Sequence, residues 1–247
     1  MRFNRITPVI AGLFATAAFV TADPIIKKSD VVFMYQADPA TYAAYQATLL
    51  AWGGQPTQHS LQDAHSQGTT YFGSVGMVTE FSRYYERFPD NYREGLGRDL
   101  QGDPIKVPWL VDHQHKGIPF WVCCTRQPNF RQYLKERVAE TVCGGADGVH
   151  IDDHMGTAAF VWRGLCFCER CEADFIPYLE THLSDAEKAT HGIHDIDTFD
   201  YSDAVNAWLV AVPSREFDQH PLWRHWTTYH ANYTVEFMAE LKAYAAE

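Results

Sequence analysis

Short apolar runs rich in β-branched and aromatic residues alternate with helical periodicities along most of the chain. One helical pattern, residues 39–52, follows the first such run, and another begins at Pro128 and stops at Gly144-Gly145. Strands and helices that alternate with short turns are typical of parallel βα units, so we expect an α/β fold. The predicted strands are 31–35, 69–75, 118–123 and 148–152.

The number of predicted strands limits the architecture. A (β/α)8 TIM barrel needs eight βα units, whereas residues 153–247 contain no further strand pattern. They end in an amphipathic stretch, 222–244, with apolar residues at helical spacing. We therefore expect only the N-terminal half of a TIM barrel, about four βα units, in a chain cut from a longer protein. A compact open α/β domain is the alternative.

The first 22 residues are organised like a secretory signal peptide. Arg2 and Arg5 precede an apolar run, residues 9–20, and small residues precede Asp23. The run is shorter than the ~20 apolar residues that a membrane-spanning helix needs. We expect residues 1–22 to be removed and residues 23–247 to form a secreted or periplasmic protein with no membrane attachment.

Charge narrows the class of partner. The chain has 20 Lys and Arg against 31 Asp and Glu, a net charge of -11. An acidic surface repels polyanions, so nucleic acid is excluded as a general partner. A homo-oligomer is left open.

The cysteines are spaced like metal ligands. The C-x-C-x-x-C cluster of Cys166, Cys168 and Cys171 is one thiolate short of a closed shell of four, and Cys123-Cys124 lies upstream. Zinc favours four thiolates, and a closed shell indicates a structural ion. Disulfides are the alternative in an exported protein, although three such close cysteines crowd one another. Cys143, at a helix end, is expected to be a buried thiol.

An acidic pair, Asp152-Asp153, ends the predicted strand 148–152. Side chains alternate along a strand, so His150 and Asp152 share one face. In a barrel this face points to the lumen, and catalytic groups of barrel enzymes lie at the carboxyl ends of the strands. The alternative is that the pair caps the following helix.

These motifs together resemble a known family. The run 124–131, the acidic pair at a strand end and the cysteine cluster 166–171 are similar to the β-galactosidases of glycoside hydrolase family 42 and to uncharacterised glycosyl-hydrolase-like barrels related to them. The resemblance covers roughly 118–247 and, more loosely, everything from Asp30. It implies a TIM barrel and a structural zinc, and it selects Cys124 over Cys123 as a ligand. The implied ligands are Cys124, Cys166, Cys168 and Cys171.

The chain also departs from the family. The galactosidases carry Asn-Glu at the end of strand four, where this chain has Asp152-Asp153, so galactosidase specificity is not carried over. Their nucleophile lies on a strand beyond the end of this sequence. The resemblance implies an exported glycoside hydrolase that acts on an oligo- or polysaccharide, with Asp152 as nucleophile or acid/base and Asp153 beside it.

Glycoside hydrolysis needs a second carboxyl group. The candidates in the sequence are Asp153, Glu80 after the second predicted strand, and Asp112 before the third. Aromatic and polar side chains at the barrel mouth are expected to hold the sugar. The expected substrate-binding residues are Glu80, Asp112, His113, Trp121, His150 and His154.

Other functions remain open at this point. The chain is alternatively a non-catalytic carbohydrate-binding barrel, or a truncated and inactive fragment of an enzyme. A third alternative is metal-assisted hydrolysis by the cluster of His150, Asp152, Asp153 and His154.

Overall fold

The computed structural model describes residues 26–78 and 80–246, so the predicted signal peptide, residues 1–22, lies outside the described residues. The chain divides into two units, Met1–Asp30 and Val31–Glu247. In the first, the described residues form a turn in which the Asp30 amide donates to the Lys27 carbonyl. None of the helices within 26–78 and 80–246 combines the length and the apolar character that a membrane crossing requires. The description below concerns the second unit.

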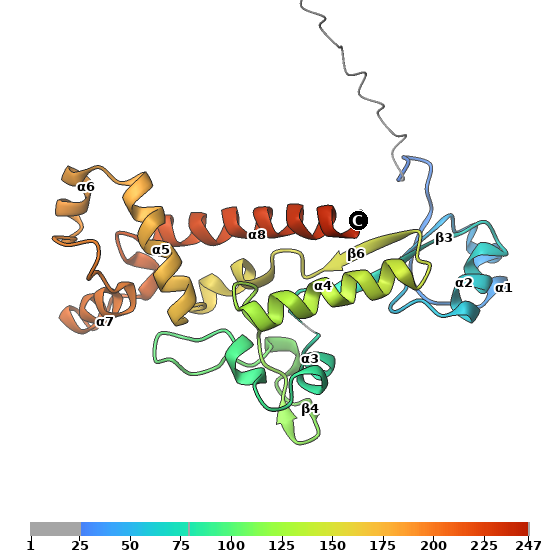
Figure 1. Ribbon diagram of the computed structural model, residues 1–247, viewed down its shortest axis with the longest axis horizontal. Coiled ribbons are helices and arrows are strands. Elements are labelled where there is room, and N and C mark those ends of the chain that lie inside the picture. The colour runs from blue at the N-terminus through green and yellow to red at the C-terminus, as the bar shows by residue number, and fades with distance from the viewer. Residues whose placement is uncertain (1–25, 79, 247) are drawn as a thin grey trace, which may run out of the picture. The chain divides into compact units, whose positions relative to one another are not determined.

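Four parallel strands form the central sheet in the order β1-β2-β3-β6; of these, β3 and β6 are labelled in Figure 1. Each strand therefore lies beside the one that precedes it in this series, as in consecutive βα units. The predicted α/β class with parallel strands is confirmed. The strands are β1 (Val32–Tyr35), β2 (Leu49–Trp52), β3 (Thr70–Gly76) and β6 (Gly148–Asp152).

Helices connect the strands. α1 (Pro39–Tyr45) joins β1 to β2, α2 (Gln58–His65) joins β2 to β3, and α4 (Pro128–Cys143) leads into β6. The Asp38 and Thr57 side chains accept backbone N–H groups at the starts of α1 and α2, which satisfies donors that a helix leaves unpaired. The predicted helix from Pro128 and the predicted strand Gly148–Asp152 are confirmed.

One predicted strand is wrong. The segment 118–123 is not part of the parallel sheet, because Ile118–Pro119 (β5) instead pairs antiparallel with Gln114–His115 (β4). Proline lacks an N–H donor and is disfavoured in a central strand. The missing strand is β2, which we expected to be the end of a helix. That helix stops early because Gln46 takes a left-handed conformation and its N–H caps the last turn.

The segment between β3 and α4 is a structured insertion. It contains α3 (Phe81–Arg87), two 3-10 turns at Tyr92–Gly95 and Pro108–Leu110, and the hairpin of β4 and β5. Aromatic residues of the insertion pack against aromatic residues of α4, and this contact holds the chain after β3 close to that helix. The packed aromatic residues are Phe81, Tyr84, Tyr92, Phe130 and Tyr133.

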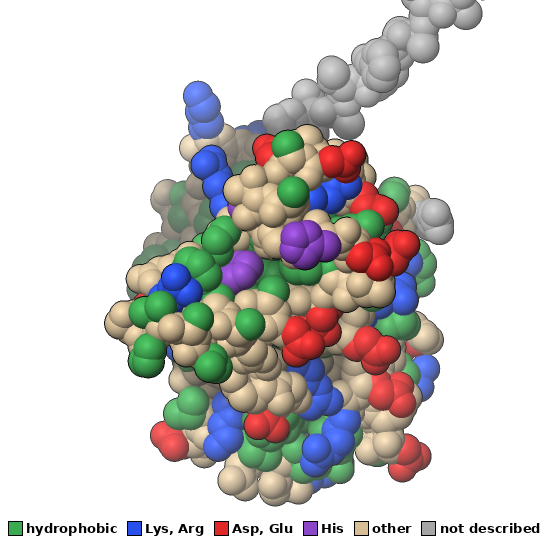
Figure 2. Space-filling view, turned by 90° about the vertical axis from the view of Figure 1, so that its left-hand side faces the viewer, with side chains coloured by type: hydrophobic (Ala, Val, Ile, Leu, Met, Phe, Trp, Pro, Cys, Tyr) green, Lys and Arg blue, Asp and Glu red, His purple; other side chains and the backbone are tan. Residues whose placement is uncertain are grey.

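A helical region follows β6. The long helix α8 contacts the 3-10 segment η3 as well as α4 and α5, and it runs beside α4 in Figure 1. The face shown in Figure 2 exposes acidic, basic and hydrophobic side chains together. The predicted C-terminal helix is confirmed, and Trp226, Tyr229 and Phe237 on it are buried. The elements are η3 (Gly156–Arg163), α5 (Glu169–His182), α6 (Asp185–Thr190), α7 (Tyr201–Ala211), η4 (Phe217–Gln219) and α8 (Trp223–Ala245).

Because His220 and His230 are buried, we expect acid to destabilise the helical region that follows β6. Burial lowers the pKa of His220 to about 4 and that of His230 to about 3, against 6.5 for an ordinary histidine. As the pH falls below about 6.5, the unfolded chain binds these protons before the folded chain does, so the free energy of unfolding should decrease until the pH reaches about 3. Urea unfolding between about pH 7 and about pH 4 measures the slope, and His230→Phe should make it shallower. An unchanged slope in this variant would contradict the explanation.

Candidate active site and candidate metal centre

A cavity of about 490 Å³ opens at the carboxyl ends of the four parallel strands. Such ends lie along one edge of a parallel sheet, where ligands of α/β proteins bind. Asp152, the last residue of β6, lines this cavity. The other lining residues are Tyr35, Gln36, Trp52, Gly53, Gly54, Ser74, Gly76 and Glu80.

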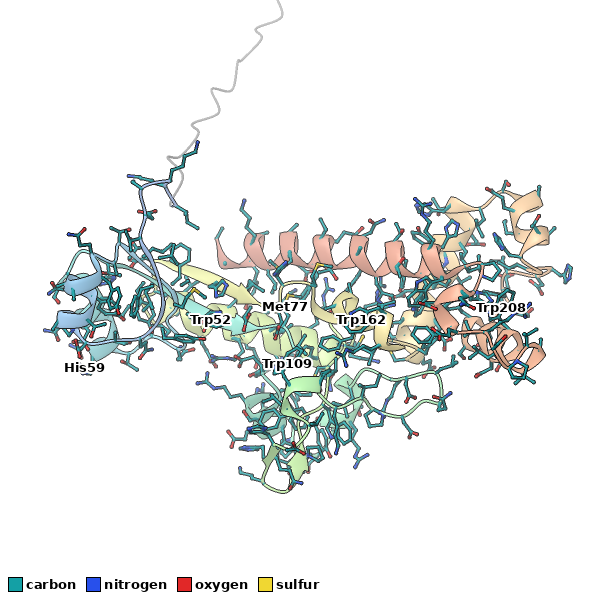
Figure 3. All side chains as sticks on the ribbon, turned by 180° about the vertical axis from the view of Figure 1, so that it is seen from behind. Trp52, His59, Met77, Trp109, Trp162 and Trp208 are labelled. Carbon is teal, nitrogen blue, oxygen red and sulfur yellow. The ribbon has the colours of Figure 1, made fainter. Side chains whose placement is uncertain are left out.

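Aromatic rings form one wall of the cavity. The rings of Tyr35 and Trp52, which end β1 and β2, lie 5.3 Å apart between centroids. Trp52, labelled in Figure 3, also contacts the ring of His150 at 5.7 Å. Burial lowers the pKa of His150, and the nearby Asp152 opposes that shift. His150 is therefore a neutral neighbour of Asp152 at neutral pH.

Glu80 brings a second carboxyl group to the same cavity. It precedes α3, and its Oε2 accepts a hydrogen bond from Tyr133 Oη at 2.9 Å and one from Arg137 Nε at 3.3 Å. The Arg137 side chain is only 5% exposed and that of Glu80 18%. Burial, followed by the Glu80 charge, raises the pKa of the Tyr133 phenol well above its usual value, which keeps this hydroxyl a donor.

The structure brings together only part of the predicted sugar-binding set. Glu80 and Asp152 share the cavity, with His150 behind Trp52. Asp112 and His113 are exposed on the turn before β4, and Trp121 packs against the aromatic core of the insertion. These three were expected at the mouth because the segment 118–123 was taken for a strand of the parallel sheet.

Two predicted residues follow Asp152 without lining the cavity. Asp153 has a left-handed backbone (φ 51) and His154 is exposed. Among the described residues, His150, Asp152, Asp153 and His154 do not converge as a group of metal ligands. The alternative of a hydrolytic metal at this cluster therefore gains no support.

Sequence reasoning missed the aromatic wall of the cavity. Tyr35 and Trp52 both end parallel strands, and each is followed by residues with little bulk or with a polar side chain. Trp52 was hidden because Leu49–Trp52 was assigned to a helix. Reading Gly53-Gly54 as the end of a strand instead of the end of a helix would have found it.

All four predicted metal ligands come together. The sulfur atoms of Cys124, Cys166, Cys168 and Cys171 lie within 4.8 Å of one another and all four residues are buried. We call them the four-cysteine cluster. The six cysteines of the chain are free, so the alternative of disulfides is not what the structure shows. Four converging sulfur atoms could hold a metal ion.

The other two cysteines lie outside the four-cysteine cluster. Cys123 is buried, and burial raises its thiol pKa well above the usual value, so it stays protonated. Cys143 is exposed, which corrects the expectation of a buried thiol. It is the last residue of α4 and begins an exposed turn with Gly144 and Gly145, so the chain has left the core at this point.

The surroundings of the four-cysteine cluster shift the pKa values of its thiols in opposite directions. Burial raises the pKa of Cys166 and Cys171, whereas hydrogen bonding with the neighbouring thiols, Cys124 first, lowers the pKa of Cys168. Four buried thiols cannot all ionise without a cation between them. A metal ion removes this cost, because coordination deprotonates thiols outright.

Helix α8 holds the two halves of the four-cysteine cluster together. Tyr229 Oη donates to the Cys171 carbonyl and Tyr233 Oη donates to the Thr125 carbonyl, each at 2.9 Å. The Arg126 guanidinium lies over both tyrosine rings, 4.2 Å and 3.7 Å from their centroids, and pairs with Asp174 on α5. The segment before α4 and the start of α5 are thus fixed against one helix.

Comparisons of the chain with protein-family models, with curated proteins and with solved structures gave no match. The functional argument therefore depends on the residues of the two sites.

Proposed function

We propose that this protein is an exported glycoside hydrolase in which Asp152 acts in catalysis. The observation that supports it is the cavity at the carboxyl ends of the strands, where Asp152 lies with a second carboxyl group and an aromatic wall. Hydrolysis of a glycosidic bond needs two carboxyl groups, one to protonate the leaving oxygen and one to attack or to activate water. Tyr35 and Trp52 provide apolar faces for a sugar ring, and Gln36 and Ser74 provide hydrogen bonds.

The proposal includes the first half of a (β/α)8 barrel. The sheet order follows the chain order, and β1 and β6 each have one neighbour among the described strands. A barrel closes when further parallel strands pair with both edges. In this arrangement Asp152 ends the fourth strand, as in the family that the sequence resembles.

Zinc is the metal that best fits the four-cysteine cluster. Four thiolates satisfy a borderline-soft ion of tetrahedral preference and leave no position open for water. Cys124, Cys166, Cys168 and Cys171 would hold it, and it would join the segment before α4 to the start of α5 without taking part in hydrolysis. Export is supported by the arrangement of residues 1–22 in the sequence.

Replacing Asp152 with asparagine tests the proposed function. We expect hydrolysis of a panel of aryl glycosides by the wild type, and a fall in kcat of about 100-fold to 10,000-fold in Asp152→Asn. Asp90→Asn, at an exposed turn after α3, is the matched control and should keep full activity. Equal activity in Asp152→Asn and wild type would remove Asp152 from the mechanism.

A carbohydrate-binding protein without catalysis is the second candidate, because Arg137 and Tyr133 already engage Glu80. This candidate predicts that oligosaccharides bind in calorimetry, that Trp52→Ala abolishes the binding, and that no glycoside on the panel is hydrolysed.

A further inference from the structure

We infer that Glu80 is the second catalytic carboxylate and acts as the nucleophile, with Arg137 and Tyr133 as its positioning residues. The inference rests on the proposed glycosidase function and completes the catalytic pair within the described strands. The family that the sequence resembles would instead lead us to expect the nucleophile on a later strand.

The two oxygens of Glu80 have different surroundings. Oε2 accepts from Tyr133 Oη and Arg137 Nε, whereas the contact of Oε1 is a long one, 3.5 Å from the Gly76 amide nitrogen. Since Glu80 also lines the cavity, Oε1 is the oxygen that remains for a substrate. The donors on Oε2 are a phenol and a guanidinium, so this carboxyl group is arranged as an acceptor and not as a proton donor.

Strand pairing places this oxygen near Asp152. Gly76 is the Cα partner of Asp152 in the pairing of β3 with β6, and neighbouring strands lie about 4.8 Å apart. Oε1 therefore lies beside the backbone position that is directly opposite Asp152. A close pair, with carboxyl groups about 5 Å apart, is the arrangement of enzymes that form a covalent glycosyl intermediate.

Asp152 is left as the acid/base. Its Oδ1 accepts the Asp153 amide at 2.9 Å, and no arginine or lysine pairs with it among the described residues. In the first step, a lone pair of Glu80 Oε1 bonds to the anomeric carbon, the bond to the leaving oxygen breaks, and that oxygen takes the Asp152 proton. In the second step, water gives a proton to Asp152 and its oxygen to the anomeric carbon, which releases the Glu80 carboxylate.

Arg137 is suited to position Glu80 because its own place is fixed. It lies on α4, its side chain is almost fully buried, and it also pairs with Glu140, a residue outside the cavity. A misplacement of about 1 Å at a reacting group costs on the order of 100-fold in rate. Loss of the guanidinium should therefore lower kcat while KM changes little.

Covalent labelling tests the nucleophile. Wild-type protein is incubated with 2,4-dinitrophenyl 2-deoxy-2-fluoro glycosides of the sugars that it hydrolyses, and the labelled peptide is sequenced by mass spectrometry. We expect the ester on Glu80, no label in Glu80→Gln, and formation of a glycosyl azide when azide is added to Glu80→Ala. A label on Asp152, or full activity in Glu80→Gln, overturns the inference and leaves the proposed function standing. Failure of the wild type to hydrolyse any glycoside overturns the proposed function.

The positioning role is tested by kinetics. Arg137→Met should lower kcat about 100-fold, and Arg137→Lys should restore part of it. Arg224→Met removes an exposed arginine on α8 that does not line the cavity, so it is the matched control and should behave as wild type. If Arg137→Met fails to fold, Tyr133→Phe carries the test, since it removes the phenol contact to Oε2 and keeps the ring. Unchanged kcat in this folded variant would overturn the positioning role.

Discussion

Replacing Cys171 with serine should abolish tight metal binding and unfold the helical region that follows β6. Cys171 lies in the first turn of α5, is fully buried, and is 3.5 Å from Cys124 between sulfur atoms. Structural zinc contributes an apparent ~10–16 kcal/mol in zinc-finger peptides, so even a fraction of this free energy is comparable to the total stability of a domain, about 5–15 kcal/mol. A hydroxyl in place of one sulfur leaves three thiolates and an incomplete shell.

Metal content and thermal unfolding together measure this effect. The wild type should contain one zinc per chain by elemental analysis, and a chelator should lower its Tm. Cys143→Ser is the matched control, because Cys143 is an exposed cysteine outside the four-cysteine cluster, and it should keep both the metal and the Tm. A wild-type protein free of metal, or a Cys171→Ser variant with an unchanged Tm, would rule out a structural metal.

Replacing Trp226 with alanine should lower the free energy of unfolding by about 3–5 kcal/mol. Trp226 is fully buried on α8, and its ring contacts those of Phe167, Phe175 and Tyr201 at centroid distances of 5.3, 4.8 and 4.9 Å. These rings come from the loop of Cys166 and Cys168, from α5 and from α7, so the Trp226 indole joins three segments to α8. Its removal leaves a cavity that these separate segments cannot all close.

Urea unfolding followed by far-UV circular dichroism checks this expectation. Trp162→Ala is the matched control, because Trp162 is 61% exposed on η3 and its removal should change the free energy of unfolding by less than about 0.5 kcal/mol. Equal destabilisation in the two variants would contradict the exposed position of Trp162. A Trp226→Ala variant as stable as wild type would contradict the core packing directly.

The residue pattern within a single helix or strand was sufficient to predict α4 and β6. The spacing of Phe130, Leu134 and Val138 predicts α4 because these residues pack one buried stripe, and the glycines after Cys143 end the helix. The apolar run before Asp152 predicts β6 for the same reason. The segment Leu49–Trp52 was misassigned because a short apolar run suits a buried strand and a helix equally well.

Residue spacing predicted three cysteines of the candidate metal centre, and the family resemblance selected the fourth, Cys124, over Cys123; the cavity was predictable in part. Three of the four cysteines lie in one short motif, so their convergence is a local property that sequence spacing reports. Glu80 and Asp152 line the same cavity because β3 pairs with β6 in a register that sets Gly76 opposite Asp152. The sequence pattern gave Asp112 and His113 the same substrate-binding role as Glu80. Pairing of β4 with β5 places both on an exposed turn, where they do not line the cavity.

The sequence by itself determined the α/β class, the long C-terminal helix and the three clustered cysteines, Cys166, Cys168 and Cys171. Each of these follows from residue spacing along a single element or motif. Tertiary structure alone decided which strands form the sheet, which carboxyl group shares the cavity with Asp152, and that Arg137 and Tyr133 contact that carboxyl group. These outcomes depend on contacts between residues far apart in the chain, where the free energy of burial selects one pairing among several that local propensity allows.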